Sequence, residues 1–421
     1  MGKKYIDNSW DFIGEDTKDF THIYHTYPAM MIPQIVRKLM NKYQTKNMEL
    51  IFDPYMGSGT TLVEARLRGL NVIGTDLNPL ARLIGKAKTN LVESIKLKNE
   101  IDNFKNLIYN LKTKMNYKKF IPEFSIRDNW FKEKTIIELG IIKMYIEQIE
   151  EEELKDFFLV SFTEVVRNSS LTRRGEFKLY KIKEEKRDEF NPKPINMMVE
   201  KLSENLKGYI EFEKKVLLNK KTFVKIYDFN TVENIPNEII KNNSVDMVIT
   251  SPPYGDSRTT VAYGQFSRLA NEWLGYKEAQ KIDSELMGGK KVKELKKFEF
   301  AKLDNIIDVI KERDLRRAKE VYSFYNDYQL SINNISKKLR HNGIVIYVVG
   351  NRRVSDIELP TDEITKYFFE QNNFEHLETI IRNIPNKRMP SKTSPTNKTG
   401  EKVSTMTNEY IVIMKKKARE E

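Results

Sequence analysis

A glycine-containing turn at residues 53–60, DPYMGSGT, constrains the fold of this chain most. A short apolar run at 48–52 precedes the turn and predicts a buried strand, and the residues from Thr60 to Arg68 predict a helix. A second strand is expected at 71–75 and a second helix at 79–89. Strands that alternate with helices in this way predict a parallel α/β sheet.

The same turn predicts a ligand site. Glycines let a ligand approach the backbone closely, and the N-terminus of the following helix favours electron-rich groups. Asp76 closes the next strand, where an acid accepts hydrogen bonds from ribose hydroxyls in nucleotide-binding α/β folds. Leu62 stands where the dinucleotide fingerprint has its third glycine, and the Gly-Lys-Ser/Thr end of a P-loop is absent. An adenosine-type ligand without a phosphate chain, such as S-adenosylmethionine, therefore fits best.

A second constrained stretch is TSPPY at 250–254, which follows the apolar run VDMVI. Two adjacent prolines cannot continue a strand ladder, so the strand ends there, at the edge where open α/β sheets bind ligands. The prolines stiffen the turn and leave carbonyl acceptors without competing donors. Ser251 adds an acceptor oxygen, and the ring of Tyr254 offers a flat face on which a base can stack.

This set of groups suits methylation of the exocyclic amine of cytosine or adenine. That amine is a poor nucleophile because its lone pair is delocalised into the ring. Acceptors placed on its two hydrogens stabilise the charge that develops during methyl attack, chiefly in the transition state. The atom is inaccessible inside a duplex, so the base must flip out of the stack.

With these motifs in place, the chain resembles the S-adenosylmethionine-dependent amino-methyltransferases of DNA. FDPYMGSGTTLVEA and TDLNP resemble the family's two cofactor motifs, and TSPPY resembles its catalytic motif. HTYPAMMIPQIV at 25–36 is similar to the segment that closes over the methionine part of the cofactor, and Tyr227-Asp228 resembles the third motif.

The resemblance implies both the fold and the site. The implied fold is the Rossmann-like class I methyltransferase fold, an α/β fold whose mostly parallel seven-stranded sheet ends in a C-terminal antiparallel hairpin and carries helical insertions. The expected product of the cofactor is S-adenosylhomocysteine. The implied catalytic residues are Ser251, Pro252, Pro253 and Tyr254. The implied cofactor-binding residues are Tyr27, Pro28, Ala29, Asp53, Tyr55, Gly57, Gly59, Thr60, Asp76, Leu77, Asp228 and Phe229.

The first residue of the catalytic tetrapeptide bears on the target base. In the family, Ser is usual for cytosine-N4 enzymes and Asp or Asn for adenine-N6 enzymes, so Ser251 implies cytosine N4. Methylation at cytosine C5 needs a cysteine thiolate, and this chain has no cysteine. An adenine-N6 enzyme, an RNA base methyltransferase and a catalytically silent nucleic-acid-binding subunit remain open as alternatives.

The chain divides by pattern into five parts. Residues 1–94, 219–279 and 341–421 are expected to form the methyltransferase domain, with the cofactor motifs in the first part and the catalytic motif in the second. Residues 95–218 and 280–340 are expected to be helical insertions. The first of these is either a target-recognition region in an unusual place or a helical embellishment.

The net charge of +12 favours a polyanionic partner, and double-stranded DNA is the expected one. No apolar run could span a membrane and the start MGKKYIDNSWDF has no apolar signal region, so a cytoplasmic protein without a metal site is expected. A separately encoded restriction endonuclease is an expected partner, and the oligomeric state stays open. Candidate DNA contacts are Arg173, Arg174, Lys178, Arg258, Arg268, Lys387 and Arg388.

Overall fold

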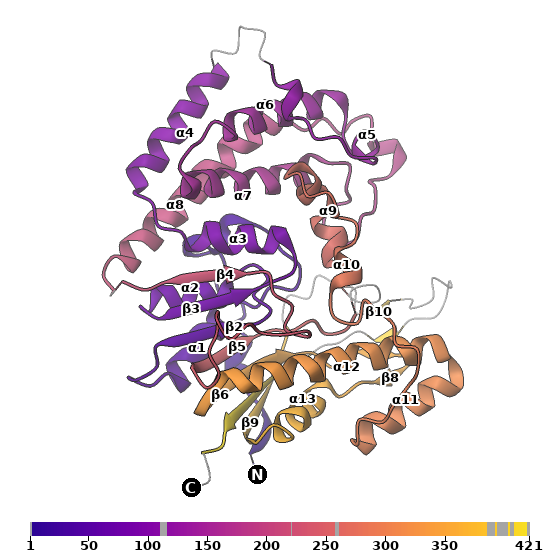
Figure 1. The fold of residues 1–421 in the computed structure, drawn as a ribbon. Helices are drawn as coiled ribbons and strands as arrows, with labels where there is room; N and C mark the ends of the chain where they lie inside the picture. The colour runs from indigo at the N-terminus through magenta and orange to yellow at the C-terminus, as the bar shows by residue number, and fades with distance from the viewer. Residues whose placement is uncertain are drawn as a thin grey trace.

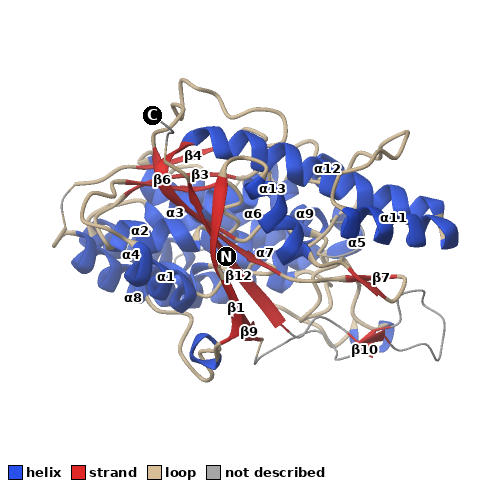
Figure 2. Cartoon of the chain, turned by 90° about the horizontal axis from the view of Figure 1, so that it is seen from below, coloured by secondary structure: helices blue, strands red, loops and turns tan. Residues whose placement is uncertain are grey.

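The centre of the protein is one mixed sheet. The computed structural model describes residues 2–109, 116–219, 221–256, 261–384, 392–393, 403–404 and 408–418. Eight strands are hydrogen-bonded in the order β1-β9-β12-β6-β5-β2-β3-β4 (Figures 1 and 2). Their bounds are β1 Lys3–Ile6, β2 Leu50–Asp53, β3 Asn71–Thr75, β4 Val224–Tyr227, β5 Val245–Thr250, β6 Leu339–Val349, β9 Phe374–Asn383 and β12 Asn408–Lys416.

This sheet confirms the Rossmann-like methyltransferase fold, but the expected number of strands was wrong. Strands β2, β3, β4, β5 and β6 are parallel, and β12 runs antiparallel between β6 and β9. The additional strand is β1, which pairs in parallel with β9 at the edge of the sheet. All four of its residues are exposed, so the sequence there has no alternation of apolar and polar residues to reveal a strand.

Two helical layers cover the sheet. On one face lie α1 (Pro33–Tyr43) and α2 (Thr60–Leu67), whose apolar side chains share a core with Met247, Ile249 and Ile346. On the other face lie α11 (Ala301–Arg313), α12 (Leu315–Lys338) and α13 (Thr361–Glu370), which share a core with Val248, Val345 and Tyr347. Strands buried on both faces explain the continuous apolar runs of β5 and β6.

A third group of helices stacks beyond α3 (Pro79–Thr89), above the sheet in Figure 1. These helices share one apolar core with α3. Their bounds are α4 Ser94–Tyr109, α5 Arg127–Trp130, α6 Glu133–Ile146, α7 Glu152–Ser169, α8 Pro194–Val216 and α9 Tyr263–Trp273. The remaining short elements are α10 (Ile282–Glu285), β7 (Arg353–Val354), β8 (Ile357–Glu358), β10 (Lys392–Thr393), β11 (Val403–Ser404) and the 3-10 helices Asn8–Trp10, Phe20–Tyr24, Lys118–Phe120 and Glu184–Lys186.

One expected helix is shorter than its sequence pattern. The residues from 28 to 43 predict a helix, yet α1 begins only at Pro33. Proline at the first helical position is favourable, but it disfavours helical backbone in the residue before it. Residues 28–32 therefore form an irregular segment, and this segment lies at the central pocket described below. Among the described residues, no helix is long and apolar enough to cross a membrane.

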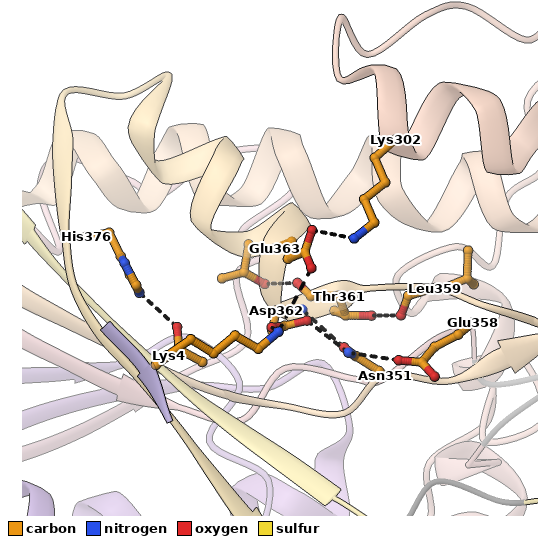
Figure 3. A network of polar contacts seen from close by, with 11 residues as sticks. Lys4, Lys302, Asn351, Glu358, Leu359, Thr361, Asp362, Glu363 and His376 are labelled. Atoms are coloured by element: carbon orange, nitrogen blue, oxygen red, sulfur yellow. Dashed lines mark hydrogen bonds and ion pairs between the residues drawn. The ribbon is translucent and has the colours of Figure 1, made fainter. Parts of the chain in front are cut away.

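A polar network holds the edge strand β1 in place (Figure 3). The buried carboxylate of Asp362 accepts from Asn351 Nδ2 at 2.9 Å and from Lys4 Nζ, on β1, at 2.5 Å. Glu363 beside it accepts from Lys302 Nζ at 2.7 Å on the surface. Asp362, in the first turn of α13, thus connects β1 with the second residue after β6.

We expect Asp362→Ala to lower the free energy of unfolding by about 2 kcal/mol, because the buried amide of Asn351 loses its 2.9 Å acceptor and keeps only the 3.4 Å contact with Glu358 Oε1. Glu363→Ala is the matched control, and its half-exposed ion pair with Lys302 should contribute less than about 1 kcal/mol. Urea denaturation of both variants checks the difference. Equal losses would show that the Asp362 network does not stabilise the edge of the sheet.

Candidate active site

A central pocket opens at the carboxyl ends of β2, β3 and β5. The glycine turn, the TDLNP motif and the TSPPY turn, which follow these three strands, therefore meet in space, together with the segment before α1. Most of the expected cofactor residues line the pocket: Tyr27, Pro28, Ala29, Asp53, Tyr55, Gly57, Thr60, Asp76, Leu77 and Phe229. Ser251 and Pro253 of the expected catalytic motif line it as well.

The shape of the glycine turn depends on left-handed backbone at two positions. Gly57 has a φ of 47° and Gly59 a φ of 76°, a region that residues with a Cβ rarely adopt. A Cβ at Gly59 would also lie 3.1 Å from the Cα of Gly85, on α3. Gly59 does not line the pocket, so its part in the geometry is to allow close packing of the turn against α3.

Two carboxylates stand at the base of the pocket. Asp53 accepts from Thr250 Oγ1 at 2.6 Å, which ties the end of β2 to the end of β5. Asp76 accepts from the backbone N–H groups of Gly57 at 3.0 Å and Asn78 at 2.8 Å. Burial raises the pKa of each carboxyl group to about 6, although these hydrogen bonds oppose the shift.

Asn78 is a pocket residue that the sequence analysis did not single out. Its buried side-chain amide donates to Tyr27 Oη at 3.1 Å and to Ser267 Oγ at 3.0 Å. Its carbonyl oxygen accepts from Leu80 N, so it also caps α3. An Asn before a Pro at the start of a helix is a recognisable signal for the cap, but only the fold brings Tyr27 to it.

Asp228, which the resemblance implies as a cofactor-binding residue, does not line the described pocket. Its side chain is 77% exposed and lies 4.0 Å from Arg82 Nη2. The neighbouring residues Phe229 and Asn230 line the pocket instead. The chain turns after β4 ends at Tyr227, and the residue that enters the pocket is therefore one or two positions further along.

The hydroxyl groups of Ser251 and Tyr254, in the expected catalytic motif, are hydrogen-bonded within the protein. Ser251 Oγ lies 3.1 Å from the carbonyl oxygen of Val348 and 3.3 Å from Tyr254 Oη. Tyr254 Oη donates to Glu409 Oε1 at 3.0 Å. Burial, with the nearby charge of Glu409, raises the pKa of Tyr254 well above its ordinary value, so Tyr254 is a neutral phenol. Pro252 and Tyr254 do not line the pocket.

The side chain of Arg352 packs against the backbone of Gly255, directly after the TSPPY turn. A Cβ at Gly255 would lie 2.0 Å from Arg352 Nη1, so only glycine allows the buried guanidinium to approach the backbone this closely. Arg352 Nη1 donates to the buried carboxylate of Asp256 at 3.3 Å. Neither contact was predicted, because Arg352 follows β6 and is distant in sequence from the turn.

Among the described residues, four of the candidate DNA contacts can be placed: Arg173, Arg174, Lys178 and Arg268. Arg173 and Arg174 line a separate groove beside α7, together with Phe177, while Lys178 does not line it. Arg268 lies on α9, 3.6 Å from Glu272. Arg258, Lys387 and Arg388 lie outside the described residues. Within the described part of the chain, no three His, Asp or Glu side chains are arranged to hold a metal ion.

The fold and the pocket define a class of α/β proteins that bind an adenosine-type ligand. The ligand site lies between the glycine turn after β2, the acid after β3 and the proline-rich turn after β5. Comparisons with known proteins agree. A family model described as DNA methylase, of the N6/N4 type, matches residues 2–86. The Type II methyltransferase M.MvaI of Kocuria varians is 39% identical over 99% of this chain and 96% of its own length.

The chain belongs to the Type II DNA amino-methyltransferases, and its cofactor is S-adenosylmethionine. The Type II methyltransferase M.BsoBI of Geobacillus stearothermophilus is 26% identical over 55% of this chain and 49% of its own length. Among solved structures, an rRNA methyltransferase, aviRa, from Streptomyces viridochromogenes covers 93% of this chain and 89% of its own at 8% identity. Its TM-score of 0.36 is too low to bear on function.

The raised pKa values predict that cofactor binding depends on pH. As the pH falls through about 6, Asp53 and Asp76 take up protons and lose their strength as acceptors for the cofactor. We therefore expect the Kd for S-adenosylhomocysteine to rise about 10-fold between pH ~8 and pH ~5, measured by titration calorimetry. In the Asp76→Asn variant the Kd should depend less steeply on pH, because only Asp53 still titrates. Affinity that is constant over this range would contradict the prediction.

Proposed function

We propose that this protein methylates the exocyclic N4 of cytosine in double-stranded DNA, with the target base flipped out of the helix. The observation that carries this proposal is the hydrogen bonding of Ser251 at the rim of the central pocket. A serine hydroxyl has one hydrogen to donate, and here Val348 O and Tyr254 Oη are its partners within the protein. The lone pairs of Oγ are then the groups left to interact with a substrate.

Such a serine acts as an acceptor for an amine hydrogen. When the target amine attacks the methyl group, positive charge develops on its nitrogen and its hydrogens become stronger donors. Ser251 Oγ would stabilise that charge, and the carbonyl of Ser251 would do the same, since the Pro252 nitrogen carries no competing hydrogen. S-adenosylmethionine supplies the methyl group. Asp53 and Asp76 would hold its polar groups.

The assignment of cytosine rests on the neutral serine at the head of the tetrapeptide and on the absence of cysteine, which excludes methylation at C5. Support for a DNA-modifying role in a restriction–modification system comes from the relative described as a Type II methyltransferase. In such a system the partner is a separately encoded endonuclease, and both proteins work in the cytoplasm.

One experiment tests the proposed base. The protein is expressed in a host that lacks DNA methyltransferases of its own, and the DNA is digested to nucleosides and analysed by mass spectrometry. N4-methylcytosine is the expected product, and it should be absent with a Ser251→Ala variant. N6-methyladenine without N4-methylcytosine would overturn the cytosine assignment, and methylation confined to RNA would overturn the proposed substrate.

A further inference from the structure

Tyr254 is hydrogen-bonded to a buried ion pair between strands β9 and β12. Tyr254 Oη donates to Glu409 Oε1 at 3.0 Å. The other carboxylate oxygen of Glu409 accepts from Arg382 Nη1 at 2.5 Å. Arg382 and Glu409 have side chains that are 5% and 17% exposed, so the pair is shielded from water. Removing either charge would leave the other one buried, so the geometry is strongly preferred.

The order and register of the strands produce this arrangement. Ser251 follows β5, and Thr250 pairs with Tyr347 on β6. On the next strand Val349 of β6 pairs with Tyr410 of β12, so Glu409 comes just beyond the catalytic turn. Arg382 on β9 is the direct cross-strand partner of Glu409. Four adjacent strands thus each place one group at the same edge of the sheet. Tyr254 follows β5, the carbonyl group that accepts from Ser251 is that of Val348 on β6, Glu409 is on β12 and Arg382 is on β9.

Arg382 itself is fixed to the start of the chain. Its Nε donates to the carbonyl oxygen of Trp10 at 2.8 Å and its Nη2 to that of Asp11 at 3.3 Å. The side chain of Asp11 accepts from the backbone N–H of Asn383 at 2.8 Å. Because these partners are backbone groups and a buried acid, the guanidinium has little freedom to turn, and neither has the carboxylate bound to it.

From these contacts we infer that Glu409, held by Arg382, is a positioning residue that sets the orientation of the Tyr254 ring for the methyl-transfer step. The inference rests on the proposed function and on the expectation from the sequence that a flipped base stacks on the ring of Tyr254. Pro253 restrains the backbone just before the ring, and Glu409 restrains the hydroxyl at the opposite end. A ring held at both ends is ordered before the base arrives, so its ordering entropy does not oppose catalysis.

The test is a double-mutant cycle on the full-length protein, with kcat measured on unmethylated plasmid DNA. Tyr254→Phe keeps the ring and removes only the hydroxyl, and we expect a loss of about 10-fold in kcat. Glu409→Ala should cause a similar loss, and Glu409→Gln, which keeps an acceptor oxygen, should recover part of it. The Kd for S-adenosylhomocysteine should not change in any of these variants.

The decisive measurement is Glu409→Ala in the Tyr254→Phe background. If Glu409 acts through the hydroxyl, the second substitution adds almost nothing to the first. A full, additive loss in that background would show a structural role only and overturn the inference, as would an unchanged kcat for Tyr254→Phe. Neither result bears on the proposed function, because Ser251→Ala and the nucleoside analysis test that function independently.

A matched control comes from the middle of the neighbouring strand β9. Glu378 on β9 also accepts hydrogen bonds from tyrosines, from Tyr5 Oη at 2.8 Å and from Tyr43 Oη, together with Lys42. It is not in the described pocket. Glu378→Gln should therefore leave kcat unchanged. A loss there equal to that of Glu409→Gln would mean that any damage to the paired strands β9 and β12 lowers turnover, and would likewise overturn the positioning role.

Discussion

Ser251→Ala is expected to lower kcat by about 100- to 1000-fold, as the removal of one well-placed group that stabilises transition-state charge does in other enzymes. The physical reason is that Ser251 Oγ accepts a hydrogen bond from the target amine while the amine nitrogen gains positive charge. The Kd for S-adenosylhomocysteine should stay within about 2-fold of the wild type, since the loss is confined to the transition state. Transfer of labelled methyl groups to plasmid DNA, with calorimetry for binding, measures both quantities.

The control for this prediction lies at the opposite end of the same strand. Ser244 precedes β5 and donates to the carbonyl oxygen of Lys241 at 2.7 Å, much as Ser251 bonds to Val348. Ser244→Ala removes a comparable hydrogen bond without touching the pocket, and kcat should be unaffected. If Ser251→Ala kept the wild-type rate, its hydroxyl would not serve as the acceptor and the proposed mechanism would be wrong.

Asp76→Ala should have the largest effect on the cofactor. Its carboxylate lines the pocket and is oriented by the backbone N–H groups of Gly57 and Asn78. Hydrogen bonds to a charged group contribute about 1.5–3 kcal/mol, so the Kd for S-adenosylhomocysteine should rise about 10- to 100-fold. At saturating cofactor much of kcat should return, because the role proposed for Asp76 is to bind the cofactor and not to take part in the transfer itself.

Asp228→Ala is the matched control for that experiment. Asp228 is an acid after a neighbouring strand, but its side chain is 77% exposed and outside the pocket. Its removal should leave the Kd unchanged. Asp76→Asn, which keeps one acceptor oxygen for the turn, separates loss of cofactor contacts from disorder of the glycine loop. Equal effects of Asp76→Ala and Asp228→Ala would contradict the ribose-binding role.

Much of the site could be predicted because its parts are local. The positive φ of Gly57 and Gly59, the strand that ends at Thr250 and the proline turn after it are properties of a few consecutive residues. The helix predicted at 79–89 and the strand at 71–75 have the bounds seen in the structure. A parallel α/β sheet then requires the two motifs to meet at one edge.

The remaining features depended on which strands are neighbours. Periodicity shows that a segment is a strand, but not what lies beside it. Glu409 and Tyr254 are 155 positions apart, and in the sequence Glu409 is an ordinary polar residue near the start of a strand. The edge strand β1 was not predicted because its four exposed residues show no alternation, and Asp228 lies outside the described pocket because the chain turns after Tyr227.

By itself, then, the sequence determined the fold class, the glycine turn and the acceptor groups at Ser251, since backbone constraints and strand patterns act over short distances. Only the tertiary structure decided that Asn78 anchors Tyr27 and that Arg382 and Glu409 hold Tyr254. Those contacts follow from the order and register of the sheet, which bring together residues that no local pattern relates.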